Sequence, residues 1–218
     1  MKTLCELSNL YDRQADLYGK DFRACHYRFR WSFLQRQQVV LKRFSGLKGK
    51  QILDVGCGPG LFSAPLAKEN QLVGIDLSLE MLKLARPELV PVRGEGALLP
   101  FKNHSFDVVL AIEVLQHFGE PAPLLREILR VIKPGGQVVV SSLNKASLLH
   151  RVLRGVGGYE GLYFHSLDEI YLLLEKEGGE NLETELLSFP FPWVWSFARG
   201  KKGSLPFAAS WVLRCKKK

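Results

Sequence analysis

The sequence predicts an α/β fold in which a mostly parallel sheet carries helices on both of its faces. Short apolar segments alternate with segments of helical spacing through the middle of the chain, as in parallel sheets with helical crossovers. A glycine-rich turn follows the first of these apolar segments, and an acid ends the second. The expected strands are 51–55, 71–76, 89–93, 107–113 and 136–143, followed by a hairpin from 182–189 and 206–215.

Start and stop signals place the helices between these strands. Pro134, Gly135 and Gly136 should close the helix that ends at Ile132 and turn the chain into the fifth strand. Ser166 and Glu169 form a capping box that opens a late helix. A basic amphipathic helix is expected at Lys145–Arg154. The other expected helices are 5–18, 22–44, 60–69, 78–86 and 121–132.

Composition favours one cytoplasmic domain. With 218 residues and 46% apolar content, the chain is long enough for a complete core. No apolar run reaches membrane-spanning length, and the N-terminus lacks the apolar stretch of a secretory signal. The four cysteines, at positions 5, 25, 57 and 215, have no metal-binding spacing and are expected to be reduced thiols.

The net charge of +8 is concentrated in the flanks of the chain. Residues 1–50 hold eleven basic and four acidic side chains, while residues 51–140 are slightly acidic. Basic flanks are where an acidic partner, an anionic membrane surface or a nucleic acid would bind. Solubility alone is an equally good explanation of this charge.

The glycine-rich turn predicts a nucleoside-binding site. The apolar segment 52–55 leads into Gly56, Gly58 and Gly60, and glycine allows positive φ and close approach of the backbone to a ligand. Asp76 lies about 20 residues further on, the separation at which α/β sites place an acid on a ribose diol. Together these residues indicate an adenosine-type cofactor.

Departures from the dinucleotide pattern narrow the choice of cofactor. A G-x-G-x-x-G fingerprint would place its third glycine at position 61, where this chain has Leu61. Asp54 stands at the end of the first strand, where an acid would repel a pyrophosphate but would suit an ammonium group. The cofactor that fits both features is S-adenosylmethionine.

Five motifs in order carry a family resemblance. They are ILDVGCGPG (52–60), GIDLS (74–78), GEGALLPF (94–101), FDVVLAIEVLQHF (106–118) and LREILRVIKPGGQVVVSS (125–142). At these spacings the chain resembles the class I S-adenosylmethionine-dependent methyltransferases, in particular the type 11 branch with the ubiquinone and menaquinone biosynthesis methyltransferases. The resemblance implies a Rossmann-like fold with a seven-stranded, mostly parallel sheet and an antiparallel C-terminal hairpin. It divides a single domain, 1–218, into an N-terminal helical lid (1–44), a cofactor-binding core (51–143) and an acceptor-side insert with C-terminal strands (144–218).

The resemblance also implies a set of cofactor-binding residues. The loop glycines should line the methionine tail with the backbone of Cys57, while Asp54 orients the loop or contacts the ammonium group. Asp76 and Leu77 should lie beside the ribose of the cofactor. Glu95 occupies the position where the family usually has an aspartate that contacts the adenine. Arg36 matches an arginine that pairs with the cofactor carboxylate in the ubiquinone O-methyltransferases, and a plain surface arginine is the alternative. The full set is Tyr18, Arg36, Asp54, Gly56, Cys57, Gly58, Gly60, Asp76, Leu77, Glu95, Gly96, Ala97, Ile112 and Glu113.

His117 is the candidate catalytic base. Methyl transfer is an in-line displacement that depends chiefly on alignment, and a base helps only where the acceptor loses a proton. His117 lies in EVLQH, which resembles the E-x-L-E-H stretch of the quinone O-methyltransferases. Gln116 replaces the second carboxylate there, so no metal is expected. The alternative for His117 is a residue that only shapes the pocket, and His165 is a weaker acceptor-side candidate.

Three functions remain open on the sequence alone. The first is methyl transfer to a small phenolic, quinone-like or lipidic acceptor, with peripheral contact at the inner face of the membrane through Lys145–Arg154 and the loop FPFPWVWSFARGKKG. The second is an RNA or DNA methyltransferase, which the basic, aromatic-rich N-terminal helices would favour. The third is a cofactor-binding subunit without activity, which the intact glycine loop opposes.

Overall fold

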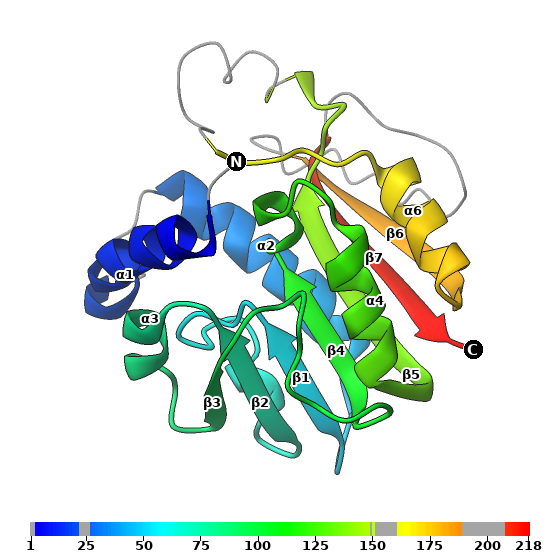
Figure 1. Cartoon of the computed structure of the whole chain (residues 1–218), viewed down its shortest axis with the longest axis horizontal. Coiled ribbons are helices and arrows are strands. Elements are labelled where there is room, and N and C mark those ends of the chain that lie inside the picture. The colour runs from blue at the N-terminus through cyan, green and yellow to red at the C-terminus, as the bar shows by residue number, and fades with distance from the viewer. Residues whose placement is uncertain (1–2, 22–26, 149, 151–160, 189–207) are drawn as a thin grey trace.

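Seven strands form one mixed sheet in the computed structural model of the chain, which describes residues 3–21, 27–148, 150, 161–188 and 208–218. The strand order is β3-β2-β1-β4-β5-β7-β6, with β1 (Gln51–Val55) near the centre (Figure 1). The remaining strands are β2 (Gln71–Asp76), β3 (Leu89–Arg93), β4 (Phe106–Ile112), β5 (Ile132–Leu143), β6 (Gly179–Ser188) and β7 (Ala208–Lys217).

The sheet is parallel from β3 to β5 and antiparallel in its last two strands. β1 pairs in parallel with both β2 and β4, and β4 pairs in parallel with β5. β7 runs antiparallel to β5 and to β6. This arrangement confirms the predicted fold class, and it brings the carboxyl ends of β1, β2, β4 and β5 to one edge of the sheet. Ligands of open α/β sheets bind at that edge.

Helices cover both faces because the buried strands are apolar on both sides. On one face, α4 (Ala122–Val131) and α6 (Leu167–Lys176) pack Leu124, Ile128 and Ile170 against the sheet. On the other face, α2 (Tyr27–Arg43) packs Val40 beside Ile52 of β1. In the view of Figure 1, α2 lies behind the sheet and α4 in front of it. The sequences of these strands are therefore continuous apolar runs and not alternations of apolar and polar residues.

Two helix predictions needed correction. The helix expected over 60–69 is a series of turns with one short 3-10 segment, η1 (Ala64–Leu66). Pro65 explains this, because proline lacks the N–H for an α-helical bond and crowds the carbonyl four residues earlier. The helix expected over 78–86 is the shorter α3 (Leu79–Lys83). The first helix, α1 (Leu4–Asp21), is longer than expected.

The turn predicted at Pro134–Gly136 is an irregularity inside β5. The strand begins at Ile132, and the β4–β5 register shifts between Phe106 and Val108. Gly135 has φ of +74°, which lets the strand bend there without being interrupted. The capping box of α6 is confirmed, since Ser166 Oγ accepts the Glu169 N–H at 3.1 Å.

Several predictions fall wholly or partly outside the described residues. They concern most of the expected helix at Lys145–Arg154, the loop from 189 to 203 and residues 22–26. Among the residues that are described, no helix is long and apolar enough to cross a membrane.

Candidate active site

The glycine loop after β1 is tied to the end of β2. The N–H groups of Gly56 and Cys57 both donate to the Ile75 carbonyl, at 2.7 and 3.1 Å. Gly56 and Gly58 have φ of +68° and +51°, a region that other residues rarely adopt. A Cβ at Gly56 would overlap Val114, whereas a Cβ at Gly58 would meet no atom within 4 Å. Gly56 is therefore required by packing, while Gly58 faces open space at the ligand-binding edge.

Asp76 links the loop to the start of α3. One carboxylate oxygen accepts the Gly58 N–H at 2.7 Å, and the other accepts the Ser78 N–H at 2.9 Å. Burial raises the pKa of the Asp76 carboxyl, and the backbone N–H groups of Ser78, Gly58 and Leu77 act in the opposite direction. Each oxygen has further lone pairs available to a ligand hydroxyl.

Asp54 lies behind the loop and not on its open side. It is 2% exposed, and its carboxylate accepts the Ser63 hydroxyl at 2.5 Å. Burial raises the Asp54 pKa to about 7, with the neighbouring Asp76 charge adding to the effect and the Ser63 bond opposing it. Cys57 is buried beside it, and its thiol donates to the Gly58 carbonyl at 3.3 Å. These contacts favour an orienting role for Asp54 over direct contact with a ligand.

Hydrogen bonds hold helix α1 against this edge of the sheet. The Ser8 hydroxyl donates to the carbonyl of Leu77 at 3.3 Å. The Asp12 carboxylate accepts the Ser78 hydroxyl at 2.5 Å and the Glu80 N–H at 3.2 Å. Figure 1 shows α1 lying beside α3 as a result. The N-terminal helix thus lies next to the strand end that carries Asp76.

Tyr11 connects α1 to His117. The phenol oxygen lies 2.8 Å from His117 Nε2, and the two rings meet edge to face with centroids 5.3 Å apart. Burial raises the pKa of Tyr11, and the charges of Asp76 and Glu113 and the nearby Tyr18 add to this effect. Tyr11 is therefore neutral at physiological pH. His117 ends the short 3-10 segment η2 (Leu115–His117), directly after the loop that follows β4.

Glu113 stands in an unusual backbone conformation at the end of β4. Its φ is +59°, although it is not a glycine. Its N–H donates to the Ser141 hydroxyl at 3.0 Å, and that hydroxyl lies 3.2 Å from Glu113 Oε1. The same oxygen lies 3.6 Å from Arg36 Nε, which is buried without a hydrogen bond. Strained residues held by their surroundings occur mainly at functional sites.

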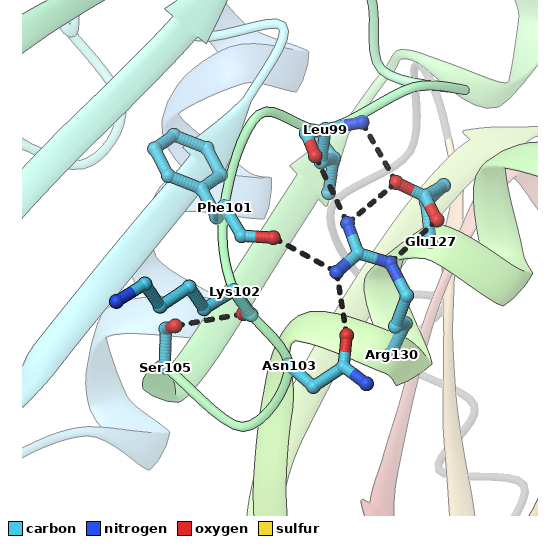
Figure 2. Close-up of polar contacts among 7 residues, drawn as sticks. All are labelled: Leu99, Phe101, Lys102, Asn103, Ser105, Glu127 and Arg130. Atoms are coloured by element: carbon cyan, nitrogen blue, oxygen red, sulfur yellow. Dashed lines mark hydrogen bonds and ion pairs between the residues drawn. The ribbon is translucent and has the colours of Figure 1, made fainter.

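The segment that follows β3 is held by α4. Arg130 donates to the carbonyls of Leu99 and Phe101 at 2.9 and 2.8 Å and to Asn103 Oδ1 at 2.7 Å (Figure 2). Glu127 pairs with Arg130 and accepts the Leu99 N–H at 2.8 Å. This network fixes the loop whose beginning is Glu95, Gly96 and Ala97. Those three residues are partly exposed.

His165, expected on the acceptor side, makes structural bonds. It is 4% exposed, and its Nε2 lies 3.2 Å from the Leu115 carbonyl and 2.9 Å from the Phe118 carbonyl. Two carbonyl partners mean that Nε2 carries the hydrogen. His165 thus fixes the turn that contains His117.

Sequence reasoning found one partner of several of these contacts and missed the other. Ser63 and Ser141 hold Asp54 and Glu113. Ser63 lies outside the five motifs, and Ser141 lies in the last of them without being predicted as a site residue. Gln37, beside Arg36, donates to the Leu61 carbonyl at 2.9 Å and so joins α2 to the glycine loop. Within the described residues, no three His, Cys, Asp or Glu side chains gather as metal ligands do.

Comparison with known proteins gives a match to a family model and similarity to curated methyltransferases. Residues 53–140 match a family model described as a methyltransferase domain. The chain is 34% identical over 122 residues to the ubiquinone biosynthesis O-methyltransferase of Sodalis glossinidius, covering 50% of this chain and 48% of that one. It is 44% identical over 106 residues to the demethylmenaquinone methyltransferase of Corynebacterium kroppenstedtii, covering 48% and 46%. The chain thus spans about half the length of the curated relatives it matches.

The structural similarity extends further than the sequence similarity. A crystal structure from Thermotoga maritima, described as a SAM-dependent methyltransferase and possible histamine N-methyltransferase, aligns with a TM-score of 0.77 at 25% identity. The alignment covers 97% of this chain and all of that one. The similarity in fold therefore extends to described elements outside residues 53–140, such as α1 and β7.

Proposed function

We propose that the protein transfers the methyl group of S-adenosylmethionine to a small phenolic, quinone-like or lipidic acceptor, starting from the match of residues 53–140 to a family model described as a methyltransferase domain. The observation that carries the proposal is the joining of Gly58 to Asp76 at the carboxyl edge of the sheet. The two curated relatives described above bear the names of quinone-biosynthesis methyltransferases, which supports an acceptor of that type.

The residues at this edge fit the cofactor. Gly58 leaves open space beside the loop, which the methionine tail would use. Asp76 would accept both ribose hydroxyls with lone pairs that its backbone bonds leave free, and charge strengthens such bonds. Arg36 Nε, buried without a hydrogen bond, would pair with the carboxylate of the cofactor. The proposed adenine and sulfonium neighbours are Leu77, Glu95, Gly96, Ala97, Ile112 and Glu113, with Tyr18 above them on α1.

His117 is the proposed catalytic base, and Tyr11 is proposed to position it. When bound, the cofactor supplies a methyl carbon on a positively charged sulfur, open to in-line attack by the acceptor. His117 would take the proton that a phenolic acceptor loses. The oxygen of the neutral Tyr11 phenol would accept the hydrogen on His117 Nε2, which would leave Nδ1 as the nitrogen that takes the proton. Alignment and exclusion of water would then supply most of the rate.

The division of the chain follows from these roles. Residues 1–44 would act as the lid, 51–143 as the cofactor-binding core and 144–218 as the acceptor side of a single domain.

The nucleic-acid alternative depends on Arg23, Arg28 and Arg30, whose side chains lie outside the described structure, and no described feature favours it. Membrane contact likewise depends on segments that lie mostly outside the described residues.

Calorimetric titration with S-adenosylhomocysteine tests the proposal. Wild type should bind, and Asp76→Ala should lose at least tenfold in affinity because it removes two charge-assisted bonds. Asp107→Ala is the matched control. Asp107 also accepts a backbone N–H, that of Gln51 at 3.0 Å, but stands at the opposite edge of the sheet. Failure of wild type to bind, or equal losses in both variants, would contradict the proposed site.

A further inference from the structure

The segment 94–105, between β3 and β4, carries the proposed neighbours of the adenine and belongs to no helix or strand. Its first residue is bonded to the ribose side of the site, because the Gly94 N–H donates to the Asp76 carbonyl at 3.0 Å. At its tip, the Leu98 N–H donates to the Glu95 carbonyl at 3.2 Å, and Leu98 is 74% exposed. One local bond cannot fix where Glu95 lies relative to the sheet. The position of this segment must therefore depend on other elements.

Arg130 of α4 holds the later half of this segment with a complete set of guanidinium bonds. Its Nη1 donates to the Phe101 carbonyl at 2.8 Å and to Asn103 Oδ1 at 2.7 Å, and its Nη2 donates to the Leu99 carbonyl at 2.9 Å (Figure 2). The other two N–H groups bind Glu127, Nε at 2.7 Å and Nη2 at 2.8 Å. A guanidinium has five N–H donors in one fixed plane. All five are used here, so Arg130 has no donor left for a ligand.

Glu127 and Arg130 together form what we call the α4 clamp. Glu127 Oε2 accepts the Leu99 N–H at 2.8 Å, so the pair holds both backbone groups of Leu99. The hydrogen bonds from Arg130 hold the pKa of the Glu127 carboxyl below its ordinary value, and the pair is therefore charged at neutral pH. The Leu99 side chain is 4% exposed and belongs to the core. The α4 clamp thus fixes the orientation of the backbone two residues after Ala97.

Gly96, nearer the tip of the segment, also packs on α4. A Cβ at Gly96 would lie 3.0 Å from Leu124 of α4 and 3.1 Å from Val55 at the end of β1. The absence of a side chain therefore lets the backbone approach both elements closely. Leu124, Glu127 and Arg130 are spaced three residues apart, which places them along one side of the helix. One rigid helix thus supports the segment both at the proposed adenine neighbours and beyond them.

We propose that the α4 clamp positions this segment for recognition of the adenine and thereby sets the nucleobase selectivity of the cofactor site. This inference rests on the proposed function, in which Glu95, Gly96 and Ala97 lie beside the base. Adenine carries an amino group that donates, whereas hypoxanthine carries at the same position a carbonyl oxygen that accepts. The Glu95 carboxylate can only accept, so it suits adenine and repels the hypoxanthine oxygen. Such recognition requires the contacting residues to be held within about 0.5 Å, which supporting residues provide.

Calorimetric titration with S-adenosylhomocysteine and S-inosylhomocysteine tests the role of Arg130. Wild type should bind the adenine compound at least about tenfold more tightly, because a site built to pair with an amino group rejects a ligand that lacks it. Arg130→Lys keeps the positive charge but cannot reproduce the planar fork of donors. This variant should lose about tenfold in affinity for S-adenosylhomocysteine and under about twofold for S-inosylhomocysteine. The ratio of the two affinities should therefore approach one.

Two further variants test the same inference independently. Glu127→Gln can still accept the Leu99 N–H but loses the charge that pairs with Arg130, so the affinity ratio should fall about threefold. This variant decides the question if Arg130→Lys does not fold. Combining Arg130→Lys with Glu95→Ala should weaken S-adenosylhomocysteine binding no more than the larger of the two single losses, because the clamp acts through the Glu95 segment.

Arg214→Lys is the matched control, since it makes the same substitution in another arginine network. Arg214 donates to Glu183 Oε2 at 2.8 Å and to Gln137 Oε1 at 3.3 Å, in the antiparallel part of the sheet. Its side chain is 23% exposed, close to the 31% of Arg130. Arg214→Lys should lower the melting temperature but keep the wild-type ratio of affinities for the two ligands.

The outcomes separate this inference from the proposed function. If wild type binds the two ligands equally well, the segment does not recognise the base and the inference is wrong. If the clamp variants keep the wild-type ratio, or lose affinity for both ligands alike, the α4 clamp serves only the fold. Additive losses in the double variant would show that Arg130 does not act through Glu95. In each of these cases the methyltransferase proposal stands, whereas failure of wild type to bind S-adenosylhomocysteine overturns both proposals.

Discussion

Alanine substitution should chiefly reduce folding stability at Gly56 and chiefly reduce ligand binding at Gly58. Both glycines have positive φ, and holding an alanine there costs about 1 kcal/mol. At Gly56 the new methyl group would also overlap Val114, which is 8% exposed and packed in the core. Overpacking of that kind costs roughly 1–3 kcal/mol. Gly56→Ala should therefore lose about 2–4 kcal/mol of unfolding free energy.

Gly58→Ala should lose only the cost of holding an alanine at positive φ, about 1 kcal/mol of unfolding free energy, because its methyl group would meet no protein atom within 4 Å. The methyl group would instead occupy space proposed for the cofactor. We expect S-adenosylhomocysteine to bind at least tenfold more weakly to this variant, a loss of about 1.4 kcal/mol or more.

Urea denaturation of the ligand-free variants and calorimetric titration of each measure the two quantities separately. Gly135→Ala is a matched control, since Gly135 also has positive φ and open surroundings but lies at the start of β5. It should match Gly58→Ala in stability and wild type in binding. Wild-type affinity in Gly58→Ala, or a stability loss as large as that of Gly56→Ala, would refute this account of the loop.

Three further predictions concern single side chains. The pKa of Asp54 in the folded protein, about 7, lies above its unfolded value, so the folded state keeps a proton that the unfolded state releases. The free energy of unfolding should therefore fall by about 1.4 kcal/mol per pH unit from about pH 4 to 7. Asp54→Asn should flatten that slope, as measured by urea denaturation at several pH values. Tyr11→Phe should leave S-adenosylhomocysteine affinity near wild type but lower kcat roughly tenfold and alter the pH–rate profile; an unchanged rate and profile would exclude Tyr11 from positioning His117. Arg130→Met should lose about 2–4 kcal/mol of unfolding free energy in chemical denaturation, because two carbonyls and the Glu127 carboxylate lose a charged donor. Lys83→Met is the control: it breaks an exposed ion pair and should change the unfolding free energy by under about 0.5 kcal/mol.

Local patterns predicted the sheet and the cofactor loop because their determinants lie close together in the chain. The strands at 51–55, 71–76 and 89–93 have the predicted bounds, since each is an apolar run between turn residues. The wrong predictions at 60–69 and at Pro134–Gly136 also have local causes. Pro65 prevents the α-helix that the spacing predicted, and Gly135 allows β5 to continue where a turn was expected. Spacing alone placed Asp76 beside the glycine loop, where its bond to Gly58 is found.

The contacts that shape the proposed active site could not be predicted in this way, because they join residues far apart in the sequence. Tyr11 and His117 are separated by 106 positions and meet only because α1 packs beside α3. Arg130 holds the Leu99 and Phe101 carbonyls across 31 and 29 positions only because α4 packs beside the segment after β3. The sequence by itself determined the fold class and the nucleoside-binding loop, since backbone preferences and apolar spacing act over a few residues. Only the tertiary structure decided which polar groups meet around the proposed site, because that depends on how distant segments pack.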